Sequence, residues 1–579
     1  MSRDTRIAPA AGPTPSALVA QVTPYPTAAR AGVDLRLDGN EGLLPAPALL
    51  DALYDAGPEV LRSYPDASGL ERRIAERHGL DPACVVVTAG ADEALDRLCR
   101  AFLGPGRECV LPVPTFEMLH RYPLLSGGIL VEVPWPPGTP WPTAAVRRAL
   151  TPRTGIVALV SPNNPTGTTL DAATLRAISA AAPTALVLLD HAYAEFADED
   201  LTPQALALPN AVVVRTLSKA YGLAGARVGY VLGARTLLEP LRAAAGPYPV
   251  AGPSLLLAAA ALRRDAAVRG FVARVRAERA ALADLLRALG AQPLPSQANF
   301  VLARFADPDW VRDALAGLGI AVRRFAGRAA LHEHLRITCP GDGSAFTRLA
   351  HALRTALQPE ALLLDLDGVL ADVSRSYRAA IIATAASFGV ALDAAEVAAA
   401  KRRGDANDDW RLTRRLMAER GVAVPQATVT GRFEALYQGS AAHPGLRATE
   451  RLIPGRTLLE RLALRLPLGI VTGRPRADAE RFLDEQGIRD LFAACVTMED
   501  APAKPDPAPV RLALQRLGVA RAWLVGDTVD DLRAARAADV VPLAVPAPGE
   551  DQDVARAAFA AAGVARTFAS LAEVLEVLP

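Results

Sequence analysis

The sequence predicts an α/β protein made of two consecutive units, and three observations lead to this fold class. The chain has 579 residues, which is too long for a single hydrophobic core. From about residue 83, short β-rich runs alternate with helical stretches, as in a largely buried parallel sheet. A second series of the same kind begins at Ala361, just after a plausible linker at Pro359. We therefore expect one unit at 1–358 and another at 359–579.

The first unit contains apolar runs that predict the strands of its main sheet. These runs are ACVVVTAG (83–90), ECVLPVP (108–114), TGIVALVSP (154–162), TALVLLD (184–190), AVVVRTLSK (211–219) and ARVGYVLG (226–233). A long amphipathic helix is predicted over 255–289, followed by a smaller α+β lobe that ends in a helix at 344–357. We place the large domain at about 46–250 and the small lobe at about 1–45 and 290–358.

The second unit predicts another doubly wound sheet. A strand starts at Ala361, and a long helical segment then runs to about Arg451. Further strands are predicted in LPLGIVTG (466–473), ACVTM (494–498), AWLVGD (522–527) and VVPLAV (540–545). The helical segment, at about 375–455, is expected to form an insertion after the first strand of a Rossmann-like sheet.

Charge and cysteine usage exclude several classes of protein. The net charge of +1 gives no electrostatic basis for binding nucleic acid or an anionic membrane. The five cysteines are scattered without a CxxC pair, which disfavours a disulfide framework and a cysteine zinc site. No run of about eighteen apolar residues and no signal peptide are recognised. We expect a soluble, cytoplasmic protein that acts on small molecules.

Lysine is rare in this chain, and its positions are therefore informative. The lysines are Lys219, Lys401 and Lys504, whereas the other 60 basic residues are arginines. Arginine replaces lysine where only charge is needed, but it cannot form a Schiff base or give up its proton. Each lysine is therefore a candidate for chemistry.

Polar residues at predicted strand ends of the first unit suit a pyridine cofactor. Lys219 follows one strand, Asp190 and Tyr193 follow another, and Asn164 lies in SPNNPTG (161–167). A carboxylate can pair with the ring nitrogen, a phenol and an amide can bind the ring oxygen, and a lysine amine can hold the ring as an imine.

Residues 20 to 355 resemble fold-type I pyridoxal-phosphate aminotransferases, and in particular histidinol-phosphate aminotransferases. The matching segments are RLDGNEG (36–42), RSYPDASGLERRIAERHGL (62–80), TAGADEALDRL (88–98), VPTFEM (113–118), SPNNPTG, TLSKAYGLAGARVGY (216–230), PSQANF (295–300) and LRIT (335–338). The resemblance implies transamination with pyridoxal 5′-phosphate as cofactor.

The resemblance also implies a role for each matching residue. Lys219 would form the Schiff base, Asp190 would pair with the ring nitrogen, and Phe116 would stack on the ring. Tyr193 and Asn164 would bind the phenolate oxygen, and Arg336 would bind the carboxylate of the amino donor. The cofactor phosphate would be held by Ala91, Asp92, Thr216, Ser218 and Arg227. Substrate would be contacted by Tyr25, Asn40, Asn299 and Arg324. Tyr64 would reach the neighbouring subunit's site, which implies a homodimer. His191 stands where the family usually has an acidic residue, and we expect it to be a packed residue at a strand end.

The second unit carries four motifs in a fixed order. A lone DxD pair, Asp365 and Asp367, would be weak evidence, because a turn could explain it. It is followed by VTGR (471–474), AKPDP (503–507) and VGDTVDD (525–531), which strand ends could bring to one sheet edge. Residues 361–579 resemble haloacid dehalogenase superfamily phosphatases with a helical cap.

This second resemblance implies metal-dependent phosphate hydrolysis. Asp365 would attack phosphorus, and Asp367 would act as general acid and base. Mg²⁺ would be bound by Asp365, the Asp367 carbonyl and Asp527, with Asp531 supporting the site. Thr472 and Lys504 would neutralise the phosphoryl oxygens. We expect Asp530 to face solvent. Lys401, in KRRGDANDDW (401–410), is equally compatible with a solvated helix end and with substrate selection.

Together the two resemblances lead to the hypothesis of two consecutive steps of histidine biosynthesis. Glutamate would aminate imidazole-acetol phosphate in the first unit, and the second would hydrolyse histidinol phosphate. Alternatives are an aminotransferase or decarboxylase acting with the phosphatase on another phosphorylated amino alcohol, a regulatory second unit, and a fusion of unrelated activities.

Overall fold

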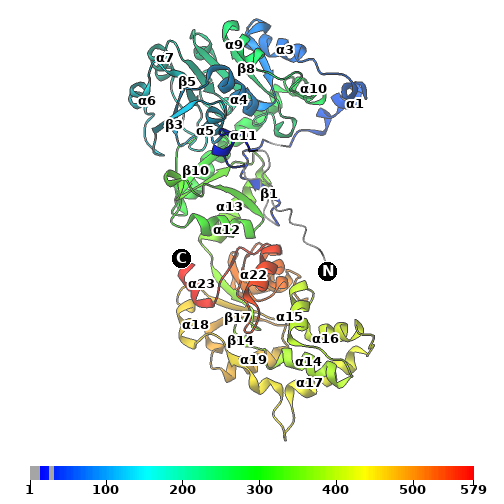
Figure 1. Ribbon diagram of the computed structural model, residues 1–579. Helices are drawn as coiled ribbons and strands as arrows, with labels where there is room; N and C mark the ends of the chain where they lie inside the picture. Colours follow the sequence, from blue (N-terminus) through cyan, green and yellow to red (C-terminus); the bar gives the residue numbers. More distant parts are fainter. Residues whose placement is uncertain (1–13, 25–31, 43) are drawn as a thin grey trace.

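The computed structural model describes residues 14–24, 32–42 and 44–579 and shows the two units end to end (Figure 1). The large domain of the first unit lies at one end, the second unit lies at the other, and the small lobe lies between them. Within the described ranges, no helix is both long enough and apolar enough to cross a membrane.

The large domain is built on a mixed, mainly parallel sheet. Its strand order is β2 (Val85–Thr88), β8 (Gly229–Gly233), β7 (Ala211–Thr216), β6 (Leu186–Asp190), β5 (Thr154–Val160), β3 (Glu108–Val113) and β4 (Ile129–Pro134). Strand β8 is antiparallel to both of its neighbours. The helices of this domain are α1 (Asp51–Ala56), α2 (Glu59–Arg62), α3 (Ser68–His78), α4 (Gly90–Phe102), α5 (Met118–Leu125), α6 (Thr143–Ala149), α7 (Ala172–Ala181), α8 (Thr202–Leu206) and α9 (Arg235–Ala243). Strand β4 was absent from the prediction.

The long helix predicted over 255–289 is in fact two helices. Helix α10 (Gly252–Ala261) ends before α11 (Asp265–Ala288) begins. Asp265 lies in the first turn of α11, where the helix dipole favours an acidic side chain, and it forms an ion pair with Arg77 of α3 at 2.7 Å. The break therefore places a charged contact to α3 at a site that helical periodicity alone does not reveal.

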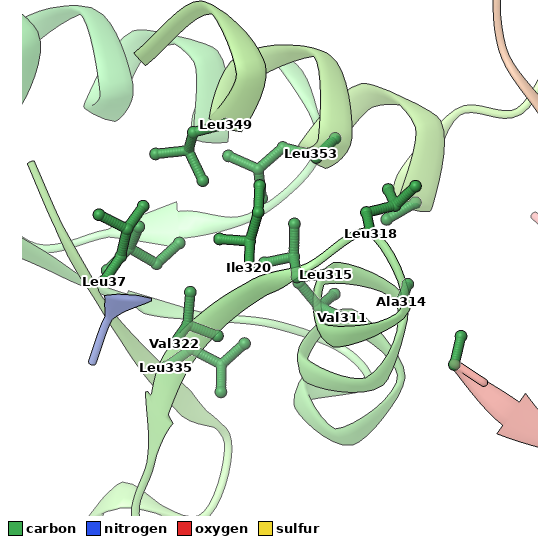
Figure 2. Packing of buried hydrophobic residues seen from close by; sticks show 14 of the residues in the cluster. Leu37, Val311, Ala314, Leu315, Leu318, Ile320, Val322, Leu335, Leu349 and Leu353 are labelled. Atoms are coloured by element: carbon green, nitrogen blue, oxygen red, sulfur yellow. The ribbon is translucent and has the colours of Figure 1, made fainter. Parts of the chain in front are cut away.

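The small lobe packs helices against one face of a second sheet. The strand order is β1 (Leu35–Leu37), β11 (Ile320–Arg324), β12 (His334–Thr338), β10 (Phe300–Arg304) and β9 (Gln292–Pro293). Figure 2 shows Ile320 of β11 and Leu37 of β1 beneath Leu349 and Leu353 of α13 (Gly343–Leu357), with Val311 contributed by α12 (Pro308–Gly317). All five are buried. The N-terminal strand β1 is thus fixed into the lobe before the chain enters the large domain.

The second unit has a parallel sheet and a separate helical cap. The strand order is β17 (Phe492–Val496), β16 (Leu468–Val471), β13 (Ala361–Leu364), β18 (Ala522–Gly526), β19 (Val541–Ala544) and β20 (Arg566–Thr567). Its helices are α18 (Arg456–Ala463), α19 (Arg476–Glu485), α20 (Ala508–Leu517), α21 (Val529–Ala537), α22 (Gln552–Ala561) and α23 (Leu571–Val577). The cap consists of α14 (Tyr377–Ser387), α15 (Ala394–Arg403), α16 (Asp409–Ala418) and α17 (Gln426–Gln438), and the short pair β14 (Ala371–Asp372) and β15 (Arg451–Leu452) joins it to the core.

Two tryptophans join the small lobe to the second unit. The rings of Trp310 and Trp523 lie 4.4 Å apart between centroids. Their indole N–H groups donate to the carbonyls of Ala356 (3.0 Å) and Thr355 (2.8 Å) in the last turn of α13. The final carbonyls of a helix have no partner within the helix, so these bonds satisfy acceptors that would otherwise be buried unpaired. Removing the second unit would therefore expose both apolar and polar groups of the first.

We predict that Trp523→Ala destabilises the second unit. Trp523 is fully buried, and truncating a buried tryptophan to alanine costs about 3–5 kcal/mol. Urea denaturation followed by circular dichroism should show an earlier transition in the variant. The matched control is Leu464→Ala, at a side chain that is 86% exposed in the same unit. Equal midpoints for wild type and Trp523→Ala would contradict the importance of this contact.

Candidate active sites

A cavity of about 410 Å³ lies between the carboxyl edge of the large sheet and the small lobe. Successive parallel strands end at this edge, so residues distant in sequence meet there. The predicted residues that line it are Asn40, Ala91, Asp92, Phe116, Asn164, Asp190, Tyr193, Thr216, Ser218, Lys219, Arg227 and Arg336. The structure thus assembles most of the first predicted site within a single cavity.

Lys219 is the central basic group of this cavity. Its ammonium donates to the carbonyl oxygen of Gly39 at 3.1 Å. Burial, together with the guanidinium of Arg336, lowers the pKa of Lys219 to about 8. A substantial share of the amine is then neutral near physiological pH, which is the form that reacts with a carbonyl group.

Asp190 is the matching acidic group at the end of β6. Burial raises its pKa to about 7, although the N–H of Ala192 donates to its carboxylate at 3.1 Å. A buried carboxyl group in this state would be stabilised by a cation in the cavity. Together with Lys219, it fits a ligand that has both a carbonyl group and a protonated ring nitrogen.

The opposite end of the cavity suits a phosphate group. Arg227 and Asp92 form an ion pair at 2.6 Å beside the first turn of α4. Gly90 has φ +80°, and a Cβ there would lie 2.7 Å from the Arg227 guanidinium, so this approach requires glycine. The hydroxyls of Thr216 and Ser218 lie 2.9 Å apart at the same end. A helix start, a guanidinium and hydroxyls together form a set of groups that binds anions.

A hydrogen-bonded group from both domains supports the ring-binding residues. Asn40 Nδ2 donates to the Tyr193 hydroxyl at 2.9 Å, and the Thr338 hydroxyl donates to Asn40 Oδ1 at 2.9 Å. Asn299 does not line the cavity but donates to the Asn40 carbonyl at 3.2 Å. Arg336 donates to Asn164 Oδ1, so Asn164 faces the guanidinium in this structure. These contacts fix the small lobe relative to the sheet edge.

Besides Asn299, two described residues predicted for this site, Arg324 and Tyr64, do not line the cavity. Arg324 instead forms an ion pair with Asp309 of α12 at 3.2 Å. Its neighbour Arg323 lines the cavity, because successive residues of β11 point to opposite faces. Tyr64 is 81% exposed and stacks on Tyr248 at 4.7 Å. Tyr25 lies outside the described residues.

His191 is a packed residue at a strand end, as expected. It is buried, and its Nδ1 bonds to the carbonyl of Ser161. The backbone N–H of Leu201 lies 3.1 Å from Nε2 and donates to it. Nε2 also lies 3.2 Å from the Asp200 carboxylate. His191 therefore joins the loops after β5 and β6 and stabilises the position of Asp190.

The second site is a cluster of buried carboxylates around a lysine. Oxygens of Asp365, Asp527 and Asp531 lie within 4.8 Å of one another. Lys504 Nζ lies 3.0 Å from Asp365 Oδ1, contacts Asp531, and donates to the Val471 carbonyl at 3.0 Å. Burial raises the pKa of Asp365 to about 7 and that of Asp527 well above its usual range. Clustered buried carboxylates of this kind fit a hard divalent cation.

The loop between β13 and β14 brings its backbone close to this cluster. Gly368 has φ +75°, and a Cβ there would lie 2.1 Å from Asp527 Oδ2, so only glycine fits. Thr472 is buried at the end of β16, where its hydroxyl accepts from the Arg474 N–H at 3.1 Å. The DxDG and VTGR segments thus converge at one sheet edge.

Asp367 is held away from the carboxylate cluster. Its Oδ1 lies 2.6 Å from Nε of Arg474, a buried arginine that also binds Glu450 at 2.9 Å. Glu450 lies where the cap returns to the core. Sequence reasoning missed the roles of Arg474 and Glu450, although Arg474 is the last residue of VTGR. In this structure the Asp367 carboxylate is therefore bound by an arginine and lies outside the cluster formed by Asp365, Asp527 and Asp531.

Two expectations for the second unit need correction. Asp530 does not face solvent: it is buried, and its carboxylate accepts from the Ala406 N–H at 3.0 Å. Lys401 is not a solvated helix end: its side chain is 13% exposed and forms an ion pair with Asp409 at 2.9 Å. Cap packing causes both differences. Arg378, also from the cap, binds Asp527 at 3.3 Å and was not predicted.

Two family models match the chain. The model described as aminotransferase class I and II covers residues 36–353. The model described as haloacid dehalogenase-like hydrolase covers residues 359–539.

Curated relatives match different shares of the chain. The histidinol-phosphate aminotransferase of Cereibacter sphaeroides (strain ATCC 17029 / ATH 2.4.9) is 38% identical over 332 residues, which cover 55% of this chain and 90% of the relative. That of Thermobifida fusca (strain YX) is 39% identical, covering 54% and 87%. A Phytophthora nicotianae protein named imidazoleglycerol-phosphate dehydratase is 47% identical over 197 residues, 33% of this chain. The chain spans only 44% of that relative's length.

A solved structure gives a further likeness. The histidinol-phosphate aminotransferase from Sinorhizobium meliloti, in complex with pyridoxal-5′-phosphate, aligns with a TM-score of 0.52 and 27% identity. The alignment covers 56% of this chain and 91% of that structure.

We predict that the lysines differ in their reactivity with pH. After a pulse of acetic anhydride, peptide mass spectrometry should show Lys219 labelling that rises with a midpoint near pH 8. Below this pH the amine is protonated and unreactive. Lys504 should remain unlabelled, because Asp365 and Asp531 outweigh the effect of burial and raise its pKa.

The variant Arg336→Gln should move the Lys219 midpoint to higher pH, since it removes a positive charge that disfavours the ammonium form. The control is Arg304→Gln, at an arginine on neighbouring β10 that pairs with Glu333 near the surface. A Lys219 midpoint at the ordinary lysine value of about 10.4 would contradict the interpretation.

Proposed function

This chain belongs to the class I and II aminotransferases and carries a haloacid dehalogenase-like hydrolase unit after its aminotransferase unit, and we propose that it catalyses two consecutive reactions. The first transfers the amino group of glutamate to imidazole-acetol phosphate. The second hydrolyses the resulting histidinol phosphate to histidinol and inorganic phosphate. One observation carries the proposal: a cavity lined by Lys219, Asp190 and Arg336 and a cluster of buried carboxylates around Lys504 lie on one chain. The histidinol-phosphate aminotransferase relatives support this choice of substrate.

The first cavity would hold pyridoxal 5′-phosphate with its ring nitrogen at Asp190 and its phosphate at Arg227 and the start of α4. When bound, this cofactor supplies an electron sink for the bonds at the substrate's α-carbon. Lys219, with its lowered pKa, would take a proton from that carbon and deliver it to the carbon on the other side of the transferred nitrogen. Arg336 would orient the amino donor by binding its carboxylate through two N–H groups.

Substrate selection in the first unit would involve Arg323 rather than Arg324. Arg323 and Arg328 both line the cavity, and each lies within 3.7 Å of Glu117. Guanidinium groups at this position suit the phosphate of the keto substrate, and Glu117 keeps them in place while the cavity is empty of that anion.

The second site would hydrolyse the phosphate ester through its own carboxylates. Asp365 would attack phosphorus to form an aspartyl phosphate while the bond to the ester oxygen breaks. Asp367, released from Arg474, would donate a proton to the leaving oxygen and then take one from the attacking water. Lys504 stabilises negative charge beside Asp365. Mg²⁺ bound to Asp365, the Asp367 carbonyl and Asp527 would supply further positive charge, with Asp531 supporting the site.

We predict that the full chain, given glutamate and imidazole-acetol phosphate, forms 2-oxoglutarate and inorganic phosphate in equal amounts. Asp365→Asn should stop at histidinol phosphate, because it removes the nucleophile. Lys219→Ala should lose transamination but still release phosphate from added histidinol phosphate. Ion chromatography and an enzymatic 2-oxoglutarate assay measure both products.

The matched control for Asp365→Asn is Asp372→Asn, at an aspartate in β14 outside the carboxylate cluster. Release of carbon dioxide without 2-oxoglutarate would instead indicate a decarboxylase. A wild-type protein that aminates the keto ester but leaves histidinol phosphate intact would contradict the two-step proposal.

We also propose that the first unit forms a homodimer. Large apolar side chains are exposed near its N-terminal helices: Leu44, Leu50, Tyr54, Leu61 and Tyr64, together with Tyr248. Exposed apolar groups that gather in one region are typical of a protein interface. Tyr64, which stacks on Tyr248 outside its own cavity, would then reach the partner's cavity.

We predict subunit complementation if Tyr64 acts across the interface. Chains carrying Lys219→Ala and chains carrying Tyr64→Ala, co-expressed with different tags, form a heterodimer in which one site has both native residues. Such heterodimers should regain about half of the wild-type transaminase rate, since one of the two symmetric sites is intact. Pairing Lys219→Ala with Asp190→Ala is the control, because both sites are then damaged. Equal recovery in the two pairings would contradict a shared site.

A further inference from the structure

The chemistry of the proposed function creates a selectivity problem at the second site. Transamination converts a ketone into a protonated amine and leaves the phosphate ester unchanged. Substrate and product of the first reaction therefore both carry the group that the second site attacks. Hydrolysis of the ketone ester would remove the first substrate before it is aminated. A useful second site must recognise the one feature that differs, which is a positive charge on the leaving group.

A loop of the cap, residues 404–409, lies over the second site. The Ala406 N–H donates to the buried carboxylate of Asp530 at 3.0 Å. Asn407 Nδ2 donates to the backbone carbonyl of Lys504 at 3.2 Å. A Cβ on Gly473 would lie 2.6 Å from the Asn407 carbonyl, so this loop also packs against the VTGR segment. Three core segments that carry the phosphatase motifs therefore hold the loop in place.

This loop ends in a buried carboxylate, Asp409, at the start of α16. Its side chain is only 10% exposed, and one oxygen lies 2.9 Å from the ammonium of Lys401. Asp409 follows by two residues Asn407, whose side chain contacts the backbone of Lys504. The Asp409–Lys401 pair thus lies beside the residues expected to perform phosphate chemistry.

The other acidic residues of the loop have different surroundings. Asp405 is 94% exposed at its side chain. Asp408 caps α16 by accepting from the Arg411 N–H at 3.0 Å. Glu450, on the opposite side of the cap, is already bound by Arg474 and by the hydroxyl of Tyr437. Asp409 is therefore the cap carboxylate that is both buried beside the site and in contact with a single lysine through one oxygen.

Space for a leaving group exists on this side of the core. A cavity of about 790 Å³ beside this loop is lined by Asn407, by Lys504 and by residues of α16 that include Arg411, Arg414 and Arg415, whereas Asp409 itself lies outside its lining. It reaches the loop that contains Asp409 and the segment that carries the lysine of the phosphate site. An extended leaving group could therefore lie between cap and core rather than point into solvent.

Resting on the proposed function, we propose that Asp409 is the specificity-determining residue of the second site. Its carboxylate binds the protonated amino group of the phosphate ester, with one oxygen held by Lys401 and the other available to the ligand. A ketone at the same position brings neither a positive charge nor an N–H donor, and its approach would leave this carboxylate desolvated without compensation. The second unit thereby distinguishes the product of the first reaction from its substrate.

The test uses the full chain with Lys219→Ala, which silences transamination. Phosphate release is measured with histidinol phosphate, imidazole-acetol phosphate and p-nitrophenyl phosphate. The parent should prefer the ammonium ester over the ketone ester in kcat/KM. Asp409→Asn should lower kcat/KM for histidinol phosphate about 10- to 100-fold, the size expected for a lost charged hydrogen bond. Hydrolysis of the other two esters should change by less than about threefold on the same scale.

Two further variants separate recognition from folding. Asp409→Glu keeps the charge and should retain part of the preference for the ammonium ester. Glu485→Gln removes an exposed carboxylate at the end of α19, outside this cavity, and should change no rate. An equal loss on all three esters in Asp409→Asn would assign Asp409 a structural role and overturn the inference. Unchanged selectivity in Asp409→Asn would overturn it as well.

Failure of the proposed function gives a different result. If the parent chain hydrolyses p-nitrophenyl phosphate but neither imidazole ester, the proposed substrate is wrong. The proposed function is then overturned together with the inference. A parent that hydrolyses histidinol phosphate with the same selectivity as Asp409→Asn would overturn the inference alone.

Discussion

A lysine that is removed from water must either lose its proton readily or have opposite charge beside it, and both active sites depend on this constraint. Lys219 is buried near the guanidinium of Arg336, and its pKa falls to about 8. Lys504 is more deeply buried, but Asp365 and Asp531 hold its pKa above the usual range. The first environment provides an amine that can react with a carbonyl and move protons. The second provides a lasting positive charge among buried carboxylates.

Neighbouring groups at each site are consistent with this difference. In the first unit, the buried carboxyl of Asp190 has a raised pKa and would be stabilised by a cationic ring. In the second unit, Asp365, Asp527 and Asp531 face the ammonium of Lys504 and the guanidinium of Arg378, and burial raises the pKa of Asp365 and Asp527, so a divalent cation would stabilise their charged forms. Each cavity thus lacks the charge that its expected cofactor would bring.

The sequence predicted residues at strand ends well, because the carboxyl edge of a parallel sheet brings such residues together regardless of their separation. Lys219, Asp190 and Asp365 are of this kind. Residues whose role depends on packing between elements were harder to predict. Arg323 and Arg324 lie on opposite faces of β11, and the sequence alone does not show which of them faces the cavity. Arg324 faces away from it because it pairs with Asp309 of α12. The burial of Asp530 and Lys401 depends on cap docking, for which the sequence has no periodic signal.

Helix α21 has a consequence for how the two activities are connected. Its N-terminal turn carries Asp531 of the second site, and near its other end Arg536 forms an ion pair with Asp34, next to strand β1 of the small lobe, at 3.4 Å. Along this helix, the carboxylate cluster and the contact to the small lobe are therefore separated by five residues, roughly 7.5 Å. Figure 1 shows the cap at the end of the molecule farthest from the large domain. Under the proposed function, an ester formed in the first cavity would have to pass the small lobe to reach the second site. Covalent fusion fixes the ratio of the two units, and under the same proposal the cap would select the ester that is hydrolysed.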